Sequence, residues 1–333
     1  MSFKMQKCEW RSLERMAKMD RFKPNKGGFD INIEDIPSLI NKFHKLMLEN
    51  MKMLDREQFL KKLSSVVRLS ESYEELKSYL KILQFPADWE DIKDAAELLR
   101  KESKEINERK LLKKYFTLFV DKKKFRRKNY IIVVSINFEG KKELLGFYEE
   151  SDWNAVFKKL KKRGLREVVM IVGREDKKLI DSAMKTNIFK FYQVDWNEVK
   201  RTLTKGMKRE EGTICRKKLE DLKKIDSYDK VLKEYENICS SYKKSYPSNF
   251  EKAIKMKEFY TAFFRFPKGV RSKISTIGTL EALERDIKNR LNMRDKLSEL
   301  LNDPLLLAYI RVKRLESGNW KIRIPVQEDW ANI

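Results

Sequence analysis

The sequence is poor in the residues that build several common kinds of functional site. Its 333 residues include one histidine, His44, and three widely separated cysteines, Cys8, Cys215 and Cys239. A serine–histidine–aspartate triad or a structural zinc site needs histidines or clustered cysteines, so neither is expected. The absence of a Cys-x-x-Cys pair also argues against a disulfide framework and predicts a reducing compartment.

Long apolar runs and phosphate-binding glycine loops are missing as well. No stretch approaches the roughly 18 apolar residues of a membrane-spanning helix. The first ten residues, MSFKMQKCEW, are charged throughout, unlike a secretory signal. The pair Gly27-Gly28 is not followed by Lys and Ser or Thr, so an ATPase loop is not expected. These features predict a cytoplasmic protein with no membrane partner.

What the chain has in excess is positive charge. Lys and Arg number 75 against 51 Asp and Glu, a formal net charge of +24 at pH 7, of which residues 121–200 carry +8 and residues 201–333 carry +11. Such a field attracts phosphate polyanions. We therefore expect double-stranded DNA as the partner and the nucleoid as the location. The open alternative is the generally charged surface that thermophilic proteins carry.

Apolar periodicity predicts an all-helical N-terminal region over residues 1–112. From about residue 36, apolar residues recur every three or four positions, as in Leu60, Leu63 and Val67. Two helical segments flank the turn QFPAD at 84–88, the outline of a candidate helix-turn-helix. The second segment begins with several acids that suit phosphate poorly, so a small structural bundle is the alternative.

Residues 113–200 alternate between strands and helices, which predicts an α/β fold class. Apolar runs indicate five strands, and amphipathic helices are expected at 151–165, between Ser151 and Gly164, and from about Asp176. The order of three strands, helix, strand, helix, strand is that of a ribonuclease-H-like core. A helical insertion is expected at 201–272, and a closing helix with a C-terminal tail at 273–333. The predicted strands cover residues 115–121, 129–138, 143–149, 167–173 and 189–194.

Two segments resemble a known family. The run NYIIVVSINFEGKKELLGFYEESDWNAVFKKLKKRGLREVVMIV at 129–172 resembles the catalytic core of Mutator-superfamily transposases, in the branch found in bacterial and archaeal insertion sequences. STIGTLEALERDIKNRLN at 275–292 resembles that family's closing helix, with its Leu-Glu pair and basic face. The resemblance covers roughly residues 70–315. It implies a mobile-element protein of the DDE type, whose three carboxylates hold two Mg²⁺ ions for DNA recombination.

The resemblance matches two of the three metal-binding carboxylates. Asp121, at the end of the first strand, takes the first position, and Glu281, in the closing helix, takes the third. Both would bind Mg²⁺ in an active enzyme, because this ion prefers oxygen ligands. Arg174 stands at the second position, where its cation would repel Mg²⁺ and pair with Asp121 instead.

Other positions also depart from the family pattern. Tyr192 and Asp195 stand where the family usually has cysteine and histidine, and Glu284 replaces an amide. Asp195 could supply a replacement carboxylate, or could only cap the following helix. Asp176, like Glu175, could serve if the strand end shifts its register.

Basic clusters surround these positions. The cluster KKKFRRK at 122–128 is expected to form a hairpin loop, either at the mouth of the site or simply solvated. Phe263, Phe264 and Phe266 are expected in the core, with stacking on DNA bases as the alternative. The residues expected to bind nucleic acid are Lys122, Lys123, Lys124, Arg126, Arg127, Lys128, Arg174, Lys205, Lys208, Arg209, Lys268, Arg271, Lys273, Arg285, Lys288 and Arg290.

Three functions remain open on the sequence. The favoured one is a transposase-like DNA-binding protein that is catalytically impaired, needs no cofactor and serves a chromosomal role. The second is an active DDE transposase that cuts and joins DNA with Mg²⁺. The third is a basic architectural protein that binds nucleic acid. A homodimer or higher homo-oligomer is expected in each case.

The DNA-binding interpretation predicts a steep dependence on salt. Phosphate contacts release counterions, so affinity for a duplex should fall on the order of 10³-fold between 50 and 200 mM salt if about six phosphates are contacted. Fluorescence anisotropy with a labelled duplex measures this slope. An affinity that stays constant over the same range would contradict DNA binding through phosphates.

Overall fold

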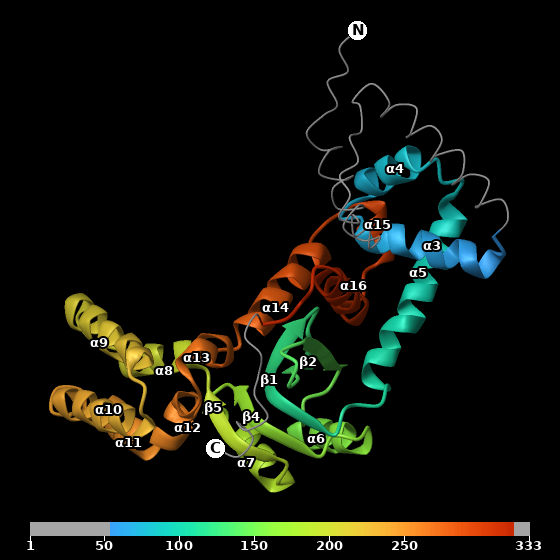
Figure 1. Cartoon of the computed structure of the whole chain (residues 1–333). Coiled ribbons are helices and arrows are strands. Elements are labelled where there is room, and N and C mark those ends of the chain that lie inside the picture. Colours follow the sequence, from blue (N-terminus) through green and yellow to red (C-terminus); the bar gives the residue numbers. More distant parts are fainter. Residues whose placement is uncertain (1–53, 323–333) are drawn as a thin grey trace, which may run out of the picture. The chain divides into compact units, whose positions relative to one another are not determined.

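A computed structural model describes residues 54–322, and Figure 1 shows its elements in sequence colours. The described residues form two compact units, residues 54–105 with 286–320 and residues 106–285 with 321–322. Between residues 54 and 322, no helix is long and apolar enough to cross a membrane. The helix predicted over 36–53, His44, Cys8 and the Gly27-Gly28 pair lie outside the described residues.

The first unit is helical in its described part. Helix α3 packs on α5, and α16 packs on both. Helices α4 and α5 confirm the predicted helix, turn and helix, whereas base reading by this pair stays a prediction. Two of the acids in α5, Asp91 and Asp94, form salt bridges to Arg56 of 2.5 and 2.6 Å. The helices are α3 (Arg56–Leu69), α4 (Tyr73–Ile82), α5 (Trp89–Lys104), the end of α14 (Gly278–Leu291), α15 (Lys296–Leu300) and α16 (Pro304–Ser317).

The second unit is built on a five-stranded mixed sheet with the order β3-β2-β1-β4-β5. Strand β2 pairs antiparallel with both β1 and β3, whereas β4 pairs parallel with both β1 and β5. All five predicted strands are present, and β4 and β5 have the predicted bounds. The strands are β1 (Lys114–Phe125), β2 (Lys128–Ile136), β3 (Lys142–Tyr148), β4 (Glu167–Gly173) and β5 (Phe189–Val194).

Two helices connect the parallel strands. Helix α6 (Trp153–Lys162) lies between β3 and β4, and α7 (Lys177–Thr186) lies between β4 and β5, and the two helices pack together. The predicted cap of α6 is wrong by one residue, because the carboxylate of Asp152, not Ser151, accepts the first amide protons. Gly164 follows the end of α6 with φ +115°, a conformation that favours glycine.

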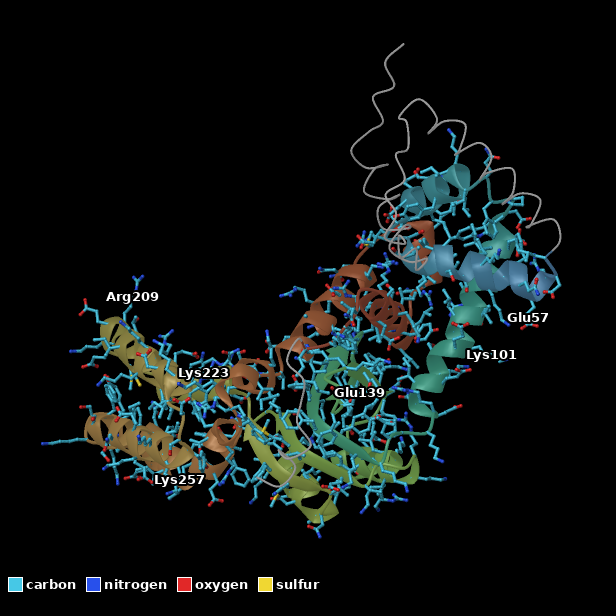
Figure 2. All side chains as sticks on the ribbon, viewed as in Figure 1. Glu57, Lys101, Glu139, Arg209, Lys223 and Lys257 are labelled. Atoms are coloured by element: carbon cyan, nitrogen blue, oxygen red, sulfur yellow. The ribbon has the colours of Figure 1, made fainter. Side chains whose placement is uncertain are left out.

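A series of helices follows β5 from Trp196 on, and its role as an insertion into the core stays a prediction. Helices α9 and α11 both pack against α10. Arg209 begins α9 at the end that lies away from the sheet, as Figure 2 shows. Phe263, Phe264 and Phe266 are buried, so core packing is confirmed, and the first two lie 5.3 Å from the Trp196 ring. The helices are α8 (Trp196–Leu203), α9 (Arg209–Asp221), α10 (Tyr228–Lys243), α11 (Pro247–Lys255), α12 (Lys257–Thr261) and α13 (Lys268–Ile274).

The basic cluster at 122–128 is not the loop that the sequence predicted. Strand β1 continues to Phe125, which pairs with Lys128 of β2, so the turn contains only Arg126 and Arg127. These two residues have φ of 46° and 68°. Such left-handed conformations cost roughly 1–2 kcal/mol for each residue that carries a Cβ. The alternation of the longer strand buries Lys123, on the same side as Asp121.

Gly173, the last residue of β4, should tolerate no side chain. A Cβ there would lie 2.7 Å from the Tyr192 hydroxyl and 2.8 Å from Leu179 Cδ2. We expect Gly173→Ala to destabilise the protein by about 2 kcal/mol through overpacking, measured by urea unfolding. Gly278→Ala is the matched control, because its Cβ would meet only Thr276 Oγ1 at 3.5 Å. Equal stability of the two variants would contradict this close packing.

Candidate functional site

Strand β1 places an acid and a base side by side. Asp121 lies two residues past Phe119, the last residue of β1 that pairs with β4, and its carboxyl group is buried. One carboxylate oxygen accepts the backbone N–H of Lys122 at 2.8 Å. The other lies 2.8 Å from Nζ of Lys123, whose side chain is also buried. A buried carboxylate needs such compensation for its lost hydration.

Arg174 follows the end of β4 and reaches three elements. Its Nε lies 3.3 Å from Asp121 Oδ2, so the pair predicted from the sequence is present. Its Nη2 lies 3.1 Å from Glu281 Oε1 on α14, and its Nη1 lies 3.8 Å from Glu198 Oε2 on α8. The Tyr192 hydroxyl donates to the Arg174 carbonyl at 2.6 Å and fixes the backbone beneath the guanidinium.

The start of α14 completes the cluster with two acids one turn apart. Glu284 Oε2 lies 2.5 Å from Nζ of Lys123, while Glu281 contacts Arg174. Four carboxylates therefore face two cations in what we call the ion-pair network, namely Asp121, Lys123, Arg174, Glu198, Glu281 and Glu284.

Asp195 fixes where α14 begins. One of its oxygens accepts the Glu198 N–H at 2.8 Å and caps α8, and the other accepts the Ile277 N–H at 2.8 Å, just before α14. The Trp196 N–H also donates to the Ser275 carbonyl at 2.9 Å. The two ends of the helical insertion are thereby held together at the carboxyl end of β5.

The electrostatics of the network favour its charged form. Burial alone would lower the pKa of Lys123, but its hydrogen bonds to Asp121 and Glu284 outweigh burial and raise it. The pKa of Arg174 is likewise raised, because the nearby carboxylates outweigh its partial burial. Burial raises the pKa of Glu198, against the pull of Arg174. Both cations therefore stay charged at neutral pH.

The donor set does not fit the two Mg²⁺ ions that the resemblance implies. Magnesium takes several carboxylate or water oxygens in a near-octahedral arrangement. Here one oxygen of Asp121 contacts both Lys123 and Arg174, and Glu281 contacts Arg174. Across the described ranges, no group of three or more His, Cys, Asp or Glu side chains is arranged to hold a metal ion. The two cations hold these carboxylates in place by ion pairs. The same oxygens would have to give up these ion pairs to bind a metal ion.

The three replacement carboxylates have other partners. Glu175 accepts the Tyr260 hydroxyl at 2.7 Å. Asp176 caps α7 and accepts the Trp153 indole N–H at 3.2 Å. Asp195, 1 % exposed, uses both oxygens as caps, which is the alternative role that the sequence left open. Catalysis by Asp176 or Asp195 stays a prediction.

Several of the predicted DNA-binding residues are bonded inside the protein. Lys123 and Arg174 belong to the network. Arg271 is 1 % exposed and donates to backbone carbonyls, including that of Phe264 at 2.7 Å. Arg290 donates to the carbonyls of residues 70 and 71. These contacts stabilise loops and helix ends within the protein, and phosphate binding by Lys123, Arg174, Arg271 and Arg290 stays a prediction.

The other predicted cations lie at the surface or close to it. Lys122 is half-buried, and its ammonium donates to the Ser151 carbonyl at 2.8 Å. DNA contact by the exposed ones stays a prediction, for Lys124, Arg126, Arg127, Lys128, Lys205, Lys208, Arg209, Lys268, Lys273, Arg285 and Lys288.

Neither the structural role of Lys123 nor the membership of Glu198 in the ion-pair network was predicted from the sequence. The structural role of Lys123 was indicated in the sequence by its position two residues after Asp121, which places both side chains on one face of a strand. That signal depended on extending β1 through a highly charged segment. Glu198 lies three residues after Asp195, the spacing of a capping box, but this pattern does not indicate that its side chain faces Arg174.

Removal of Lys123 should weaken the fold measurably. Lys123→Met leaves Asp121 and Glu284 without their ammonium partner, and we expect a loss of about 2 kcal/mol, below the cost of a lone buried charge because Arg174 remains. Urea unfolding measures this loss. Lys124→Met, at the exposed neighbouring position, is the control and should be nearly neutral.

The contribution of Lys123 should also depend on pH. Because folding raises its pKa, the stabilisation is complete below the unfolded value of about 10.4 and is lost as pH rises through the folded value. The difference in free energy of unfolding between wild type and Lys123→Met should therefore stay constant up to the unfolded pKa and shrink only at higher pH. Equal stabilities at neutral pH would contradict a stabilising role for the network.

Comparison with known proteins identifies the family of this chain. A search of curated proteins found no match. The family model described as "Transposase, Mutator family" matches residues 88–298, which is more than half of the chain. The match includes every member of the ion-pair network. The chain therefore belongs to the Mutator family of transposases.

Proposed function

We propose that this protein is a DNA-binding member of the Mutator family that has lost its metal-dependent chemistry. The observation that carries the proposal is the contact of Arg174 with both Asp121 and Glu281, at 3.3 and 3.1 Å. A cation between the first and third carboxylates of a DDE site occupies the place of metal ions. The DNA-binding surface remains, as the net charge of +24 supports.

Lys123 strengthens the proposal independently of Arg174. Its ammonium lies 2.8 Å from Asp121 and 2.5 Å from Glu284, so a second cation, on the same strand as Asp121, neutralises the same cluster. Two divalent ions repel each other and need an excess of negative ligands to hold them close. Two fixed cations reduce that excess. We infer that the site now serves to stabilise the fold.

We also propose that the sheet is a ribonuclease-H-like core. Support comes from its order β3-β2-β1-β4-β5, with an antiparallel meander followed by parallel strands, and from the position of Asp121 on the central strand. Family membership makes double-stranded DNA the natural partner. A chromosomal role in the nucleoid, carried out as a homodimer or higher homo-oligomer, completes the proposal.

The competing function is an active transposase with a replacement second carboxylate. Asp176 lies close enough to the end of β4 to be that ligand, but it caps α7 and binds the Trp153 indole. Its use would require the start of α7 to rearrange when DNA and metal bind. The impaired interpretation needs no such rearrangement, and we prefer it for that reason.

Arg174→Asp should create metal affinity that the wild type lacks. The change removes the bridging cation and adds a hard oxygen ligand, so we expect Mn²⁺ binding at least about tenfold tighter, a gain of roughly 1.4 kcal/mol. Calorimetry measures it on the full chain, and the wild type should show no Mn²⁺-dependent nicking of DNA.

Arg166→Asp is the matched control, since it makes the same change in charge at an exposed position. This control should leave Mn²⁺ binding weak. The opposite result is tight Mn²⁺ binding by the wild type that Asp176→Asn abolishes. That outcome would overturn the proposal of an impaired protein and favour an active transposase.

A further inference from the structure

The turn between β1 and β2 contains two residue types that its backbone conformation does not favour. Phe125 pairs with Lys128, so the hairpin closes with two residues, Arg126 and Arg127, and both have positive φ. Two-residue turns of this type strongly favour Asn and Gly, because each central residue adopts the left-handed conformation. Two arginines at these positions are strained, and such strain tends to persist where the side chains serve a function.

The hairpin end is held rigidly. Phe125 is 2 % exposed, and its ring lies 5.7 Å from that of Tyr130 and 5.9 Å from that of Phe147. Three residues before the turn on the same strand, at 123, the chain is tied into the ion-pair network. This packing can hold the turn in its strained conformation without help from a ligand.

The same hairpin extends past its neighbouring strands. Strand β1 pairs with β4 only as far as Phe119, which leaves six residues, about 20 Å at 3.3 Å per residue, beyond that pairing. Strand β2 pairs with β3 only from Ile131, which leaves three residues, about 10 Å. The turn is therefore the end of a two-stranded ribbon that extends past β3 and β4.

This end of the ribbon carries only positive charge. Four of the five residues from 124 to 128 are exposed Lys or Arg, and the fifth is the buried Phe125. Lys128, at the base of the turn, pairs with Glu149 at 2.8 Å. Arg126 and Arg127 thus form the end of the ribbon, and both are exposed.

We propose that this turn inserts Arg126 and Arg127 into the minor groove of duplex DNA. The proposal rests on the DNA-binding function proposed above and adds how the duplex is read. The minor groove is about 6 Å wide, so it admits side chains but not the ribbon itself. Its negative potential is strongest where A·T pairs narrow it, and arginine is the residue drawn there. The turn therefore selects A·T-rich DNA.

Inosine separates minor-groove reading from major-groove reading. An I·C pair keeps the major-groove groups of G·C but lacks the amino group in the minor groove, so it resembles A·T there. We would measure binding of the full chain to A·T, I·C and G·C duplexes of equal length by fluorescence anisotropy. The wild type should bind the first two about tenfold tighter than the third.

The test variant is Arg126→Asn with Arg127→Gly. This pair suits the turn, so the thermal midpoint should not fall, while the three duplexes should be bound alike. The control, Lys158→Gln with Lys162→Gln, removes the same charge from exposed positions on α6 and should keep the preference.

Three results would overturn the inference while DNA binding stands: no preference in the wild type, a preference that the Asn-Gly variant retains, or I·C behaving as G·C. If the wild type binds none of the duplexes at 50 mM salt, the proposed DNA-binding function itself fails, and the inference fails with it.

Discussion

The burial of Asp121 is the constraint on which the site depends. A carboxylate that is 4 % exposed has lost most of its hydration, and only bonded donors or cations compensate for that loss. Lys123 and Arg174 provide the compensation from two adjacent strands. Through these two cations, ion pairs connect Asp121 at the centre of the sheet to α14 and α8. In a metal-dependent relative, cations from solution would satisfy the same requirement.

Much of the fold could be predicted because its pattern is local. The apolar runs at 167–173 and 189–194 coincide with β4 and β5, and the amphipathic segment from 151 contains α6. Phe263 and Phe264 were expected in the core and are buried there. In these segments the periodicity of apolar residues and the preferred caps indicate the same structure, and the tertiary contacts are consistent with it.

The end of β1 could not be predicted in the same way. Four of the residues at 122–126 are Lys or Arg, and a highly charged segment indicates a loop. The strand continues because Phe125 packs against Phe147 and because Lys123 finds two carboxylates, one of them 161 residues away at Glu284. Arg174 could be placed beside Asp121 by the family pattern, but the guanidinium contact with Glu198 depends on a helix whose position no local pattern indicates.

The double cap at Asp195 has a consequence for how this fold can change. The chain leaves the core at Trp196 and returns at Ile277, and a single carboxylate holds both points. Helices α9 and α10, which lie between α8 with its Glu198 and the buried Phe263, Phe264 and Phe266, could therefore lengthen, shorten or be exchanged without moving β5 relative to the start of α14. Related chains could acquire new surfaces there while the spacing of the core acids stays the same.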